Sequence, residues 1–217
     1  MQPTRTNGRQ QIDLETWERK ATFNFFKGFT EPFHGVCVRV DCTETFQYAK
    51  EHELSVSFAL FHRCLVAAHQ VENFRTRIVD GVAWRYDRIH GGSAVGRPNG
   101  TIGFAYYLFH EDIQKFVRDA SLESERVRNR EDIERSSDVD YIRFSTLPWL
   151  DFTSLSHARD LSREDSLPRI TLGKITEANG RRTMPISIHV HHALADGLHV
   201  AEFVEQVQRF LAAPEIS

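Results

Sequence analysis

The sequence contains few cysteines and no long hydrophobic run, and each shortage limits what the protein can be. The three cysteines, Cys37, Cys42 and Cys64, are an odd number and show no Cys-x-x-Cys spacing. Reduced, partly buried thiols are therefore expected. No apolar stretch is long enough to cross a bilayer, and no N-terminal apolar run follows basic residues as in a secretory signal. These shortages predict a cytoplasmic protein with no membrane partner.

A strong charge of either sign is also missing. The 27 Lys and Arg residues nearly balance the 30 Asp and Glu residues, which leaves a formal net charge of −3. Nucleic acid is therefore not indicated as a partner. Internal repeats and low-complexity segments are absent as well. A chain of 217 residues, 41% of them hydrophobic, predicts one globular domain over residues 1–217.

Signals for both helices and strands are present along the chain. Helices are predicted over residues 13–19, 44–50 and 56–74, and from residue 113 onwards. Strands are predicted over residues 36–42, 75–79, 82–86, 101–109, 170–175 and 184–191, with hairpin turns at Asp80-Gly81 and Asn179-Gly180. Residues 1–11 are expected to be loose, 123–140 to be a charged helix end and loop, and 150–169 to be a loop.

The most informative stretch lies near the C-terminus. Residues 184, 186, 188 and 190 are apolar and alternate with polar residues, which predicts a strand. Asp196-Gly197 ends this pattern, and apolar residues then recur at helical spacing through Leu211. His192 falls in phase with the apolar side of the strand. A fixed neutral imidazole at a strand end is suited to act as a general base.

Ordinary structural roles explain the same residues without any catalysis. A histidine in a strand is most often a packed or hydrogen-bonded residue. Asp196, which precedes Gly and a helix, is typical of an N-cap, although it could also anchor the histidine turn. A metal site of His189, His191 and His192 is disfavoured because adjacent strand residues point to opposite faces.

Four separated blocks resemble a known family and favour the catalytic interpretation. His191-His192-Ala-Leu-Ala-Asp196-Gly197 is similar to the active-site signature of the chloramphenicol acetyltransferases, and more loosely to the HHxxxDG motif of the CoA-dependent acyltransferases. Trp17-x-Arg19, Ser145-x-x-Pro-Trp149 and Thr171 resemble other blocks of that family, in the same order. The resemblance implies an α/β fold, a two-layer mixed β-sheet covered by helices, and the predicted order of elements agrees with it. It also implies a homotrimer with an inter-subunit active site.

The resemblance implies direct transfer of an acetyl group from acetyl-CoA to a hydroxyl-bearing acceptor, without a metal. His192 would be the general base, Ser145 would donate a hydrogen bond to the oxyanion, and Thr171 would act through a water. Arg19 would pair with Asp196 and orient the turn. Composition alone would instead make Ser145 a turn serine before Pro148 and Arg19 a surface charge.

Two residues would bind the coenzyme by the same resemblance. Trp149 would lie beside it, and Lys174, three residues after Thr171, would meet a CoA phosphate. A solvated strand lysine is an equally good interpretation of Lys174.

The acceptor pocket departs from the family most. Its expected residues are Phe25, Phe26, Phe104, Leu155 and His157. The family commonly has a Phe-Tyr pair where this chain has Phe25-Phe26, and a small residue at the position of Phe104. An aromatic residue is expected at the position of Leu155 and an aliphatic one at that of His157, while Arg143 replaces an uncharged amide. Three hypotheses follow: a chloramphenicol O-acetyltransferase, an acyltransferase of the same fold with another alcohol, and a non-catalytic trimer that binds CoA or an apolar ligand.

Overall fold

A mixed β-sheet runs through the part of the chain that this computed structural model describes, residues 8–133 and 138–215. Its strands stand in the order β2 (Phe33–Asp41), β10 (Arg181–His191), β8 (Arg169–Leu172), β7 (Tyr141–Thr146), β5 (His90–Gly96) and β6 (Ile102–Tyr107). The short β9 (Thr176–Ala178) also pairs with β10. Strand β7 runs parallel to both β5 and β8. A second sheet joins β1 (Arg9–Gln11), β4 (Val82–Tyr86) and β3 (Thr76–Val79).

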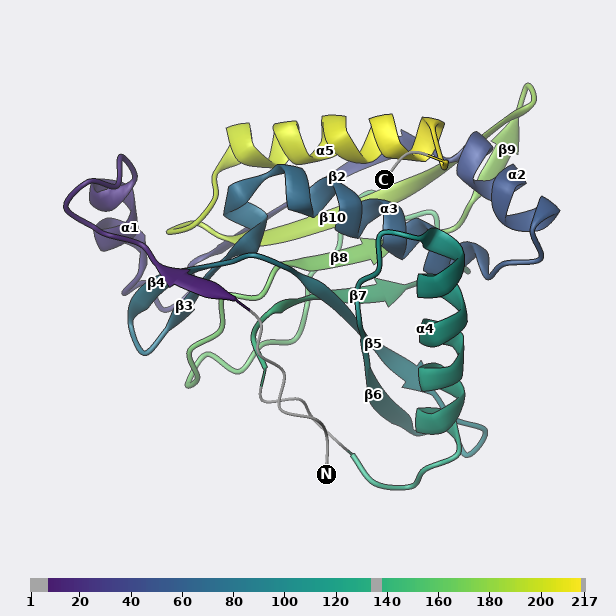
Figure 1. Cartoon of the computed structure of the whole chain (residues 1–217), viewed down its shortest axis with the longest axis horizontal. Coiled ribbons are helices and arrows are strands. Elements are labelled where there is room, and N and C mark those ends of the chain that lie inside the picture. Colours follow the sequence, from purple (N-terminus) through teal and green to yellow (C-terminus); the bar gives the residue numbers. More distant parts are fainter. Residues whose placement is uncertain (1–7, 134–137, 216–217) are drawn as a thin grey trace.

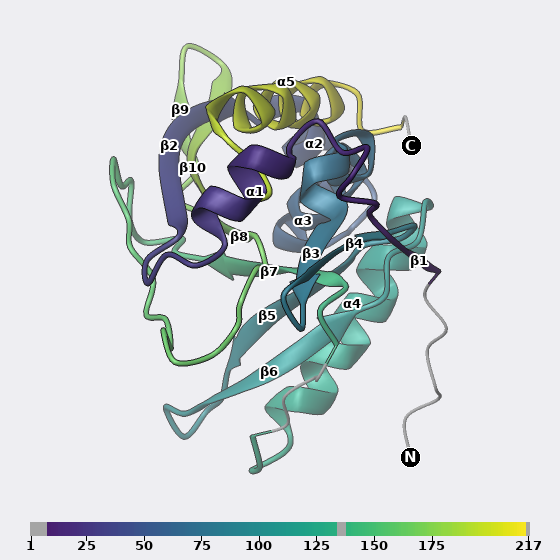
Figure 2. The same cartoon turned by 90° about the vertical axis from the view of Figure 1, so that its left-hand side faces the viewer.

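Helices cover one face of the large sheet (Figure 1). Helices α3 (Val56–Gln70) and α5 (Gly197–Ala212) pack against each other, with α2 (Thr43–Glu51) and α4 (Ile113–Arg128) beside them. Helix α1 (Lys20–Phe26) lies apart from these four, at the end of the molecule that faces the viewer in Figure 2. No helix within the described segments is both long enough and apolar enough to pass through a membrane.

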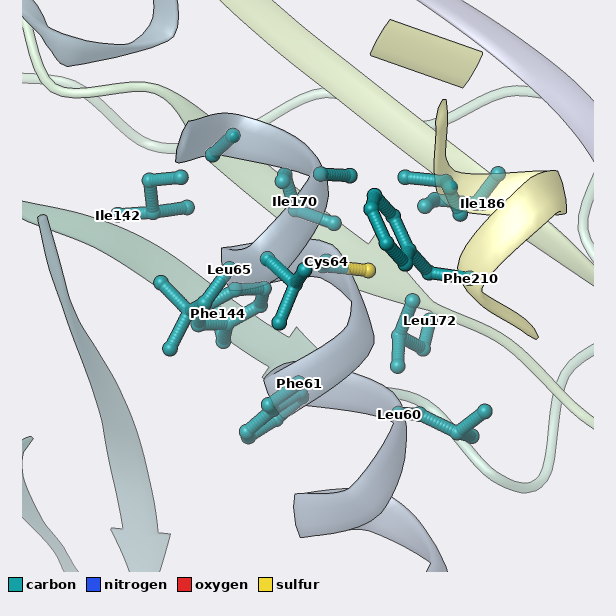
Figure 3. Close-up of a cluster of buried hydrophobic side chains, with 14 of the residues drawn as sticks. Leu60, Phe61, Cys64, Leu65, Ile142, Phe144, Ile170, Leu172, Ile186 and Phe210 are labelled. Atoms are coloured by element: carbon teal, nitrogen blue, oxygen red, sulfur yellow. The ribbon is translucent and has the colours of Figure 1, made fainter. Parts of the chain in front are cut away.

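The core lies between this helical layer and the sheet. Alternate residues of the central strands are apolar and point toward the helices, among them Ile142, Phe144, Ile170, Leu172 and Ile186. They meet Phe61, Cys64 and Leu65 of α3 and Phe210 of α5 (Figure 3). Each such side chain stabilises the fold by about 1.5–3 kcal/mol relative to an exposed one. This packing fixes the positions of the central strands.

The opposite face of the sheet is polar. Ser145 of β7 pairs with Thr171 of β8, which pairs with Ser187 of β10. Because residues in register share a face of the sheet, these three hydroxyl side chains form a row across it. The irregular segment 147–168 lies on this side, where His157 contacts Thr171. The sheet therefore buries one face and leaves polar groups on the other.

Several predicted elements are confirmed. The strand near the C-terminus is β10, and the helix after it is α5. The hairpin turn at Asp80-Gly81 joins β3 and β4 with φ values of 53° and 74°, the left-handed conformation that this residue pair favours. The predicted helices at residues 44–50 and 113 correspond to α2 and α4, and Asp112 caps α4 by accepting from the Lys115 N–H.

The predicted helix over residues 13–19 is wrong. The Asp13 carboxylate accepts from the Glu15 N–H and the Thr16 hydroxyl, which forms a turn in place of a helix. The helix begins at Lys20 instead. Of the stretch expected to be loose, residues 9–11 form β1, whereas residues 1–7 lie outside the described part.

Three other predictions need correction. The helix predicted to reach residue 74 ends at Gln70, and a 3-10 turn follows. The strand predicted over 170–175 ends at Leu172, and the N–H of Lys174 donates to the Leu150 carbonyl outside the sheet. Ser145 lies inside β7, so the turn interpretation of it is wrong. The charged segment 123–140 is confirmed as a helix end, through Arg128, followed by irregular chain, with residues 134–137 outside the described part.

Candidate active site

The histidine turn, residues 192–196, follows directly after β10. The strand ends at His191, and the N–H of His192 donates to the Pro32 carbonyl at 2.8 Å. The N–H groups of Leu194 and Ala195 donate back to the His191 carbonyl. His192 is therefore at the end of the strand, as predicted, and is the first residue of the turn.

Arg19 ties this turn to the N-terminal part of the chain. Its Nη1 donates to Asp196 Oδ2 at 2.7 Å, its Nη2 to the His192 carbonyl at 2.8 Å and its Nε to the Ala193 carbonyl at 3.0 Å. The Arg19 side chain is only 10% exposed. A guanidinium with all three sets of donors engaged holds both backbone and side chain of the turn in one geometry. The structure thus brings Arg19 and Asp196 together, as expected.

Asp196 is also the N-cap of α5. Its carboxylate accepts from the Leu198 N–H, and His199 Nδ1 lies 2.7 Å from Oδ1 in a capping box. Burial alone would raise the pKa of Asp196, but hydrogen bonds from Arg19 and His199 bring that pKa well below its ordinary value. The cap and the anchor of the turn are therefore the same residue, and both interpretations of Asp196 hold.

The ring of His192 is held by aromatic neighbours. It stacks on Phe26 of α1 with 4.0 Å between ring centroids and 5° between planes. The His34 ring lies 4.5 Å away. His192 Nδ1 is buried and has no hydrogen-bond partner among the described residues, so Nε2 is the ring nitrogen that can meet a substrate.

His34 is a neighbour of the site that the sequence did not reveal. It lies on β2 opposite Val190, and its Nε2 is 3.2 Å from the Ala195 carbonyl. Burial lowers the pKa of His34, although the hydrogen bond to Ala195 raises it in part. A lone histidine in a predicted strand carries no signal of this kind until strand pairing places it beside β10.

A second group of predicted residues lies on the polar face of the sheet. Ser145 and Thr171 are cross-strand neighbours. His157 Nε2 is 3.4 Å from Thr171 Oγ1, and the His157 ring meets the His189 ring edge-on at 4.9 Å. Burial, with a smaller contribution from His189, lowers the pKa of His157 to about 4. The ring is therefore neutral at physiological pH.

A cavity of about 1050 Å³ opens beside this second group. Phe104 and Ser145 line it, together with charged residues from β7, β8 and the segment 147–168. Leu155 is half-buried and, like His157 and Thr171, is outside the lining. The volume suits a small-molecule substrate.

The two groups are far apart within one chain. His192 lies five residues beyond Ser187 along β10, and Ser187 is two strands away from Ser145. With about 3.3 Å per residue along a strand and about 4.8 Å between neighbouring strands, His192 lies about 17 Å along the sheet and about 10 Å across it from Ser145. The direct separation is therefore roughly 20 Å. No described contact joins His192 to Ser145 or Thr171. A single chain therefore does not assemble a histidine base and a serine donor around one substrate.

The remaining predicted residues are exposed. Trp149 is 77% exposed and Phe25 is 64% exposed. Lys174 is exposed too, and its N–H donates to the carbonyl of Leu150, next to Trp149, at 2.8 Å. Trp149 and Lys174 therefore lie at the same loop. Phe25 packs edge-on against Phe26, which stacks on His192.

A metal centre does not emerge from the histidines. His191 is buried against Phe33, whereas His192 lies in the turn against Phe26. Across the described residues, no group of three or more His, Cys, Asp or Glu side chains could hold a metal ion.

Comparison with known proteins gives a consistent result. Residues 8–208 match the model of the family described as chloramphenicol acetyltransferase. The chain is 26% identical to a chloramphenicol acetyltransferase of Proteus mirabilis, over 95% of this chain and 96% of that protein. It is 24% identical to one of Clostridioides difficile, over 95% and 98%.

Solved structures agree with the sequence comparison. One described as chloramphenicol acetyltransferase superposes with a TM-score of 0.86 at 31% identity, over 94% of this chain and all of that chain. The dihydrolipoamide acetyltransferase of Azotobacter vinelandii superposes with a TM-score of 0.64 at 16% identity, over 84% and 82%. The predicted CoA-dependent acyltransferase fold, a mixed sheet covered by helices, is therefore confirmed.

Proposed function

Because the chain belongs to the chloramphenicol acetyltransferase family, we propose that it transfers the acetyl group of acetyl-CoA to a hydroxyl group of a small molecule, with chloramphenicol as the first acceptor to consider. The observation that carries this proposal is the histidine turn. Arg19 engages Asp196 and two carbonyls of the turn, and Phe26 stacks on the His192 ring. So many fixed contacts around one imidazole suit a base that must be held at one angle.

His192 acts as the general base in this proposal. Its Nε2 takes the proton of the acceptor hydroxyl while the hydroxyl oxygen forms a bond to the thioester carbonyl carbon. The carbon–sulfur bond then breaks, and the proton passes to the departing thiolate. The buried Nδ1 supports this assignment, because it leaves Nε2 as the nitrogen for proton transfer. Asp196 and Arg19 are positioning residues that hold the turn.

Ser145 and Thr171 assist on the other side of the reacting carbonyl. The Ser145 hydroxyl donates to the oxygen on which negative charge develops, an effect typically worth about 3 kcal/mol. Thr171, its cross-strand neighbour, holds a water beside it. Their shared position on one face of the sheet supports this division of roles.

The active unit is a homotrimer in this proposal. The separation of roughly 20 Å between His192 and Ser145 along the strand geometry supports it, because the base of one subunit must meet the serine of another. Phe25 and Phe29 are exposed and pack against Phe26, the ring that stacks on His192, which also favours a neighbour at this surface.

Trp149 and Lys174 would hold the coenzyme, which supplies the acetyl thioester when it is bound. An exposed indole offers a stacking surface for the adenine or pantetheine part, and an exposed ammonium suits a phosphate. Their proximity at one loop fits a ligand that has both parts.

A second candidate keeps the reaction and changes the acceptor. Phe104 fills volume in the cavity, and Arg143 brings a charge close to Ser145. A charged wall is a poor match for an apolar neutral acceptor, so these residues favour another alcohol. Phe25, Phe26, Leu155 and His157 would complete the acceptor side once a neighbouring subunit is added.

The test is release of CoA from acetyl-CoA, followed with a thiol reagent, with and without chloramphenicol, for the wild type and His192→Ala. Release that depends on chloramphenicol and vanishes in the variant supports the proposal. Release with other alcohols alone supports the second candidate. No release with any alcohol would leave a non-catalytic binding domain.

A further inference from the structure

Three arginines stand together on the wall of the cavity beside Ser145. Arg143 and Arg169 are cross-strand neighbours on β7 and β8, and Arg159 comes from the segment 147–168. All three line the cavity, and together they are called the arginine group below. Like charges directly opposite each other on adjacent strands repel. Negative groups are therefore needed to hold this arrangement.

Two carboxylates serve the arginine group. Asp165 Oδ2 lies 3.1 Å from Arg143 Nη1 and 2.6 Å from Arg169 Nη2, so that one carboxylate pairs with two guanidinium groups. Glu31 pairs with Arg159. Other acidic residues of the lining have different partners: Glu123 pairs with Arg126, Asp160 with Arg163, and Glu164 accepts from the N–H groups of Asp80 and Gly81. Asp138 also belongs to the lining.

Two guanidinium nitrogens of the arginine group are left over. Arg159 Nη1 and Arg169 Nη1 are buried and have no hydrogen-bond partner among the described residues. The Arg169 side chain is only 5% exposed. The guanidinium carbons of Arg159 and Arg169 lie 4.5 Å and 5.2 Å from the centroid of the same ring, Phe33. These groups are thus held in place with donor capacity unused, which is unfavourable for a buried cation.

We propose that the acceptor of the transfer reaction carries an anionic group of the carboxylate or phosphate type, which binds to the arginine group. This inference rests on the proposed function, since it concerns the acceptor site of that reaction. Guanidinium groups bind such anions through paired hydrogen bonds. Ser145 lies two residues beyond Arg143 on the same face of β7, about 7 Å away. Ser145 and the arginine group line the same cavity, so one small molecule can reach both.

A matched pair of alcohols tests the charge directly. The first alcohol, 4-(hydroxymethyl)benzoate, carries a carboxylate and a hydroxyl on one small ring. The second, 4-(hydroxymethyl)benzamide, is its uncharged counterpart of nearly the same shape, with an NH2 donor in place of one carboxylate oxygen. Binding of each is measured by titration calorimetry, and turnover by CoA release, for the full-length wild type. The same measurements are made on Arg143→Gln. Because the Arg143 side chain is 44% exposed in the wild type, this replacement is expected to leave the fold intact.

The matched control variant is Arg163→Gln. Arg163 lines the same cavity, but it pairs with Asp160 and its side chain is 73% exposed. The wild type and Arg163→Gln are expected to prefer the benzoate by about tenfold to hundredfold, as for a charge-assisted hydrogen bond. Arg143→Gln is expected to lose most of this preference, and Arg143→Lys to restore part of it.

The outcomes separate the two proposals. Equal or tighter binding of the benzamide by the wild type, or binding of neither compound, would overturn the anionic acceptor, even if chloramphenicol releases CoA. A preference for the benzoate that Arg143→Gln abolishes supports the arginine group. If that preference appears while no alcohol, chloramphenicol included, releases CoA, the transferase assignment fails and the anion site stands.

Discussion

The histidine turn and the arginine group balance charge in different ways. In the turn, one guanidinium meets one carboxylate, and the remaining donors of Arg19 reach the carbonyls of His192 and Ala193. In the arginine group, three guanidinium groups share Asp165 and Glu31, and two nitrogens have no hydrogen-bond partner in the described part of the chain. Each nitrogen of the Arg19 guanidinium has a hydrogen-bond partner in the same chain, as expected of a residue that positions the turn. The arginine group keeps unused donors, as expected of a group that binds an anion.

The contrast also concerns rigidity. The turn is fixed by backbone hydrogen bonds on both sides of His192 and by the stacked Phe26 ring. The cavity wall depends on side chains from two strands and on an irregular segment. Changes in the turn are therefore expected to affect chemistry and stability, whereas changes in the arginine group are expected to affect which acceptor binds.

The largest effect is expected for His192→Ala. The loss of a general base typically lowers the rate 10²–10⁴-fold, so kcat should fall by about a thousandfold or more. Circular dichroism should stay close to that of the wild type, and the melting temperature should fall only modestly, because the stacking on Phe26 is lost while the backbone hydrogen bonds of the turn remain. A variant that keeps most of its CoA release would show that His192 is not the base.

Ser145→Ala is expected to have the next largest effect. Removal of one donor to the developing charge should lower kcat about 10²–10³-fold with little change in KM. Ser187→Ala is the matched control, since Ser187 lies in the same cross-strand row but contacts His189. Equal losses in the two variants would point to a general disturbance of the sheet.

Asp196→Asn is expected to lower both stability and rate. The substitution leaves the Arg19 guanidinium, which is only 10% exposed, without its anion. The free energy of unfolding should therefore fall by about 2–3 kcal/mol. This is less than the full cost of breaking a wholly buried pair, because Asp196 is 36% exposed. Chemical denaturation measures this. Glu15→Gln, which removes the exposed pair with Lys20, should change it by less than about 1 kcal/mol. An unchanged stability in Asp196→Asn would contradict the positioning role.

The smallest effect is expected from pH. Burial lowers the pKa of His157 and of His191 to about 4, so both are neutral in the folded protein while the unfolded chain takes up protons below its ordinary pKa near 6.5. Stability should therefore fall as the pH drops from about 6.5 toward 4. In His157→Leu this fall, measured as melting temperature at several pH values, should be smaller than in the wild type. An identical slope would mean that His157 does not contribute.

The histidine turn was predictable from the sequence because its parts are coded by local pattern and by separated motifs. The alternation before His192, the Asp196-Gly197 break and the Trp17-x-Arg19 block each have a one-dimensional signal. Strand β5 was not predicted, since His90-Gly91-Gly92 has low strand propensity. Gly92 is used there because the Tyr141 ring would lie 2.9 Å from an added Cβ. Such a close approach is decided by tertiary packing alone.

The arginine group illustrates the limit of prediction for the site. Arg143 drew attention only as an unusual neighbour of Ser145. Arg159 and Arg169 belong to a loop and to a buried strand, and only the register of β7 with β8 places Arg169 beside Arg143. His34 became a neighbour of His192 in the same way, through the pairing of β2 with β10. Neighbours of this kind depend on strand register, which no single segment specifies.

The contact between Arg19 and Asp196 joins residues that are 177 positions apart. A chain emerging from the ribosome exposes helix α1 long before the histidine turn is made. At about 5–20 residues per second, this interval lasts on the order of ten seconds or more. During that time the Arg19 guanidinium is solvated and has not yet met the Asp196 carboxylate. The geometry of the histidine turn is therefore among the last features to form during synthesis, and a nascent chain that stops before residue 196 has no carboxylate to pair with Arg19 in this turn.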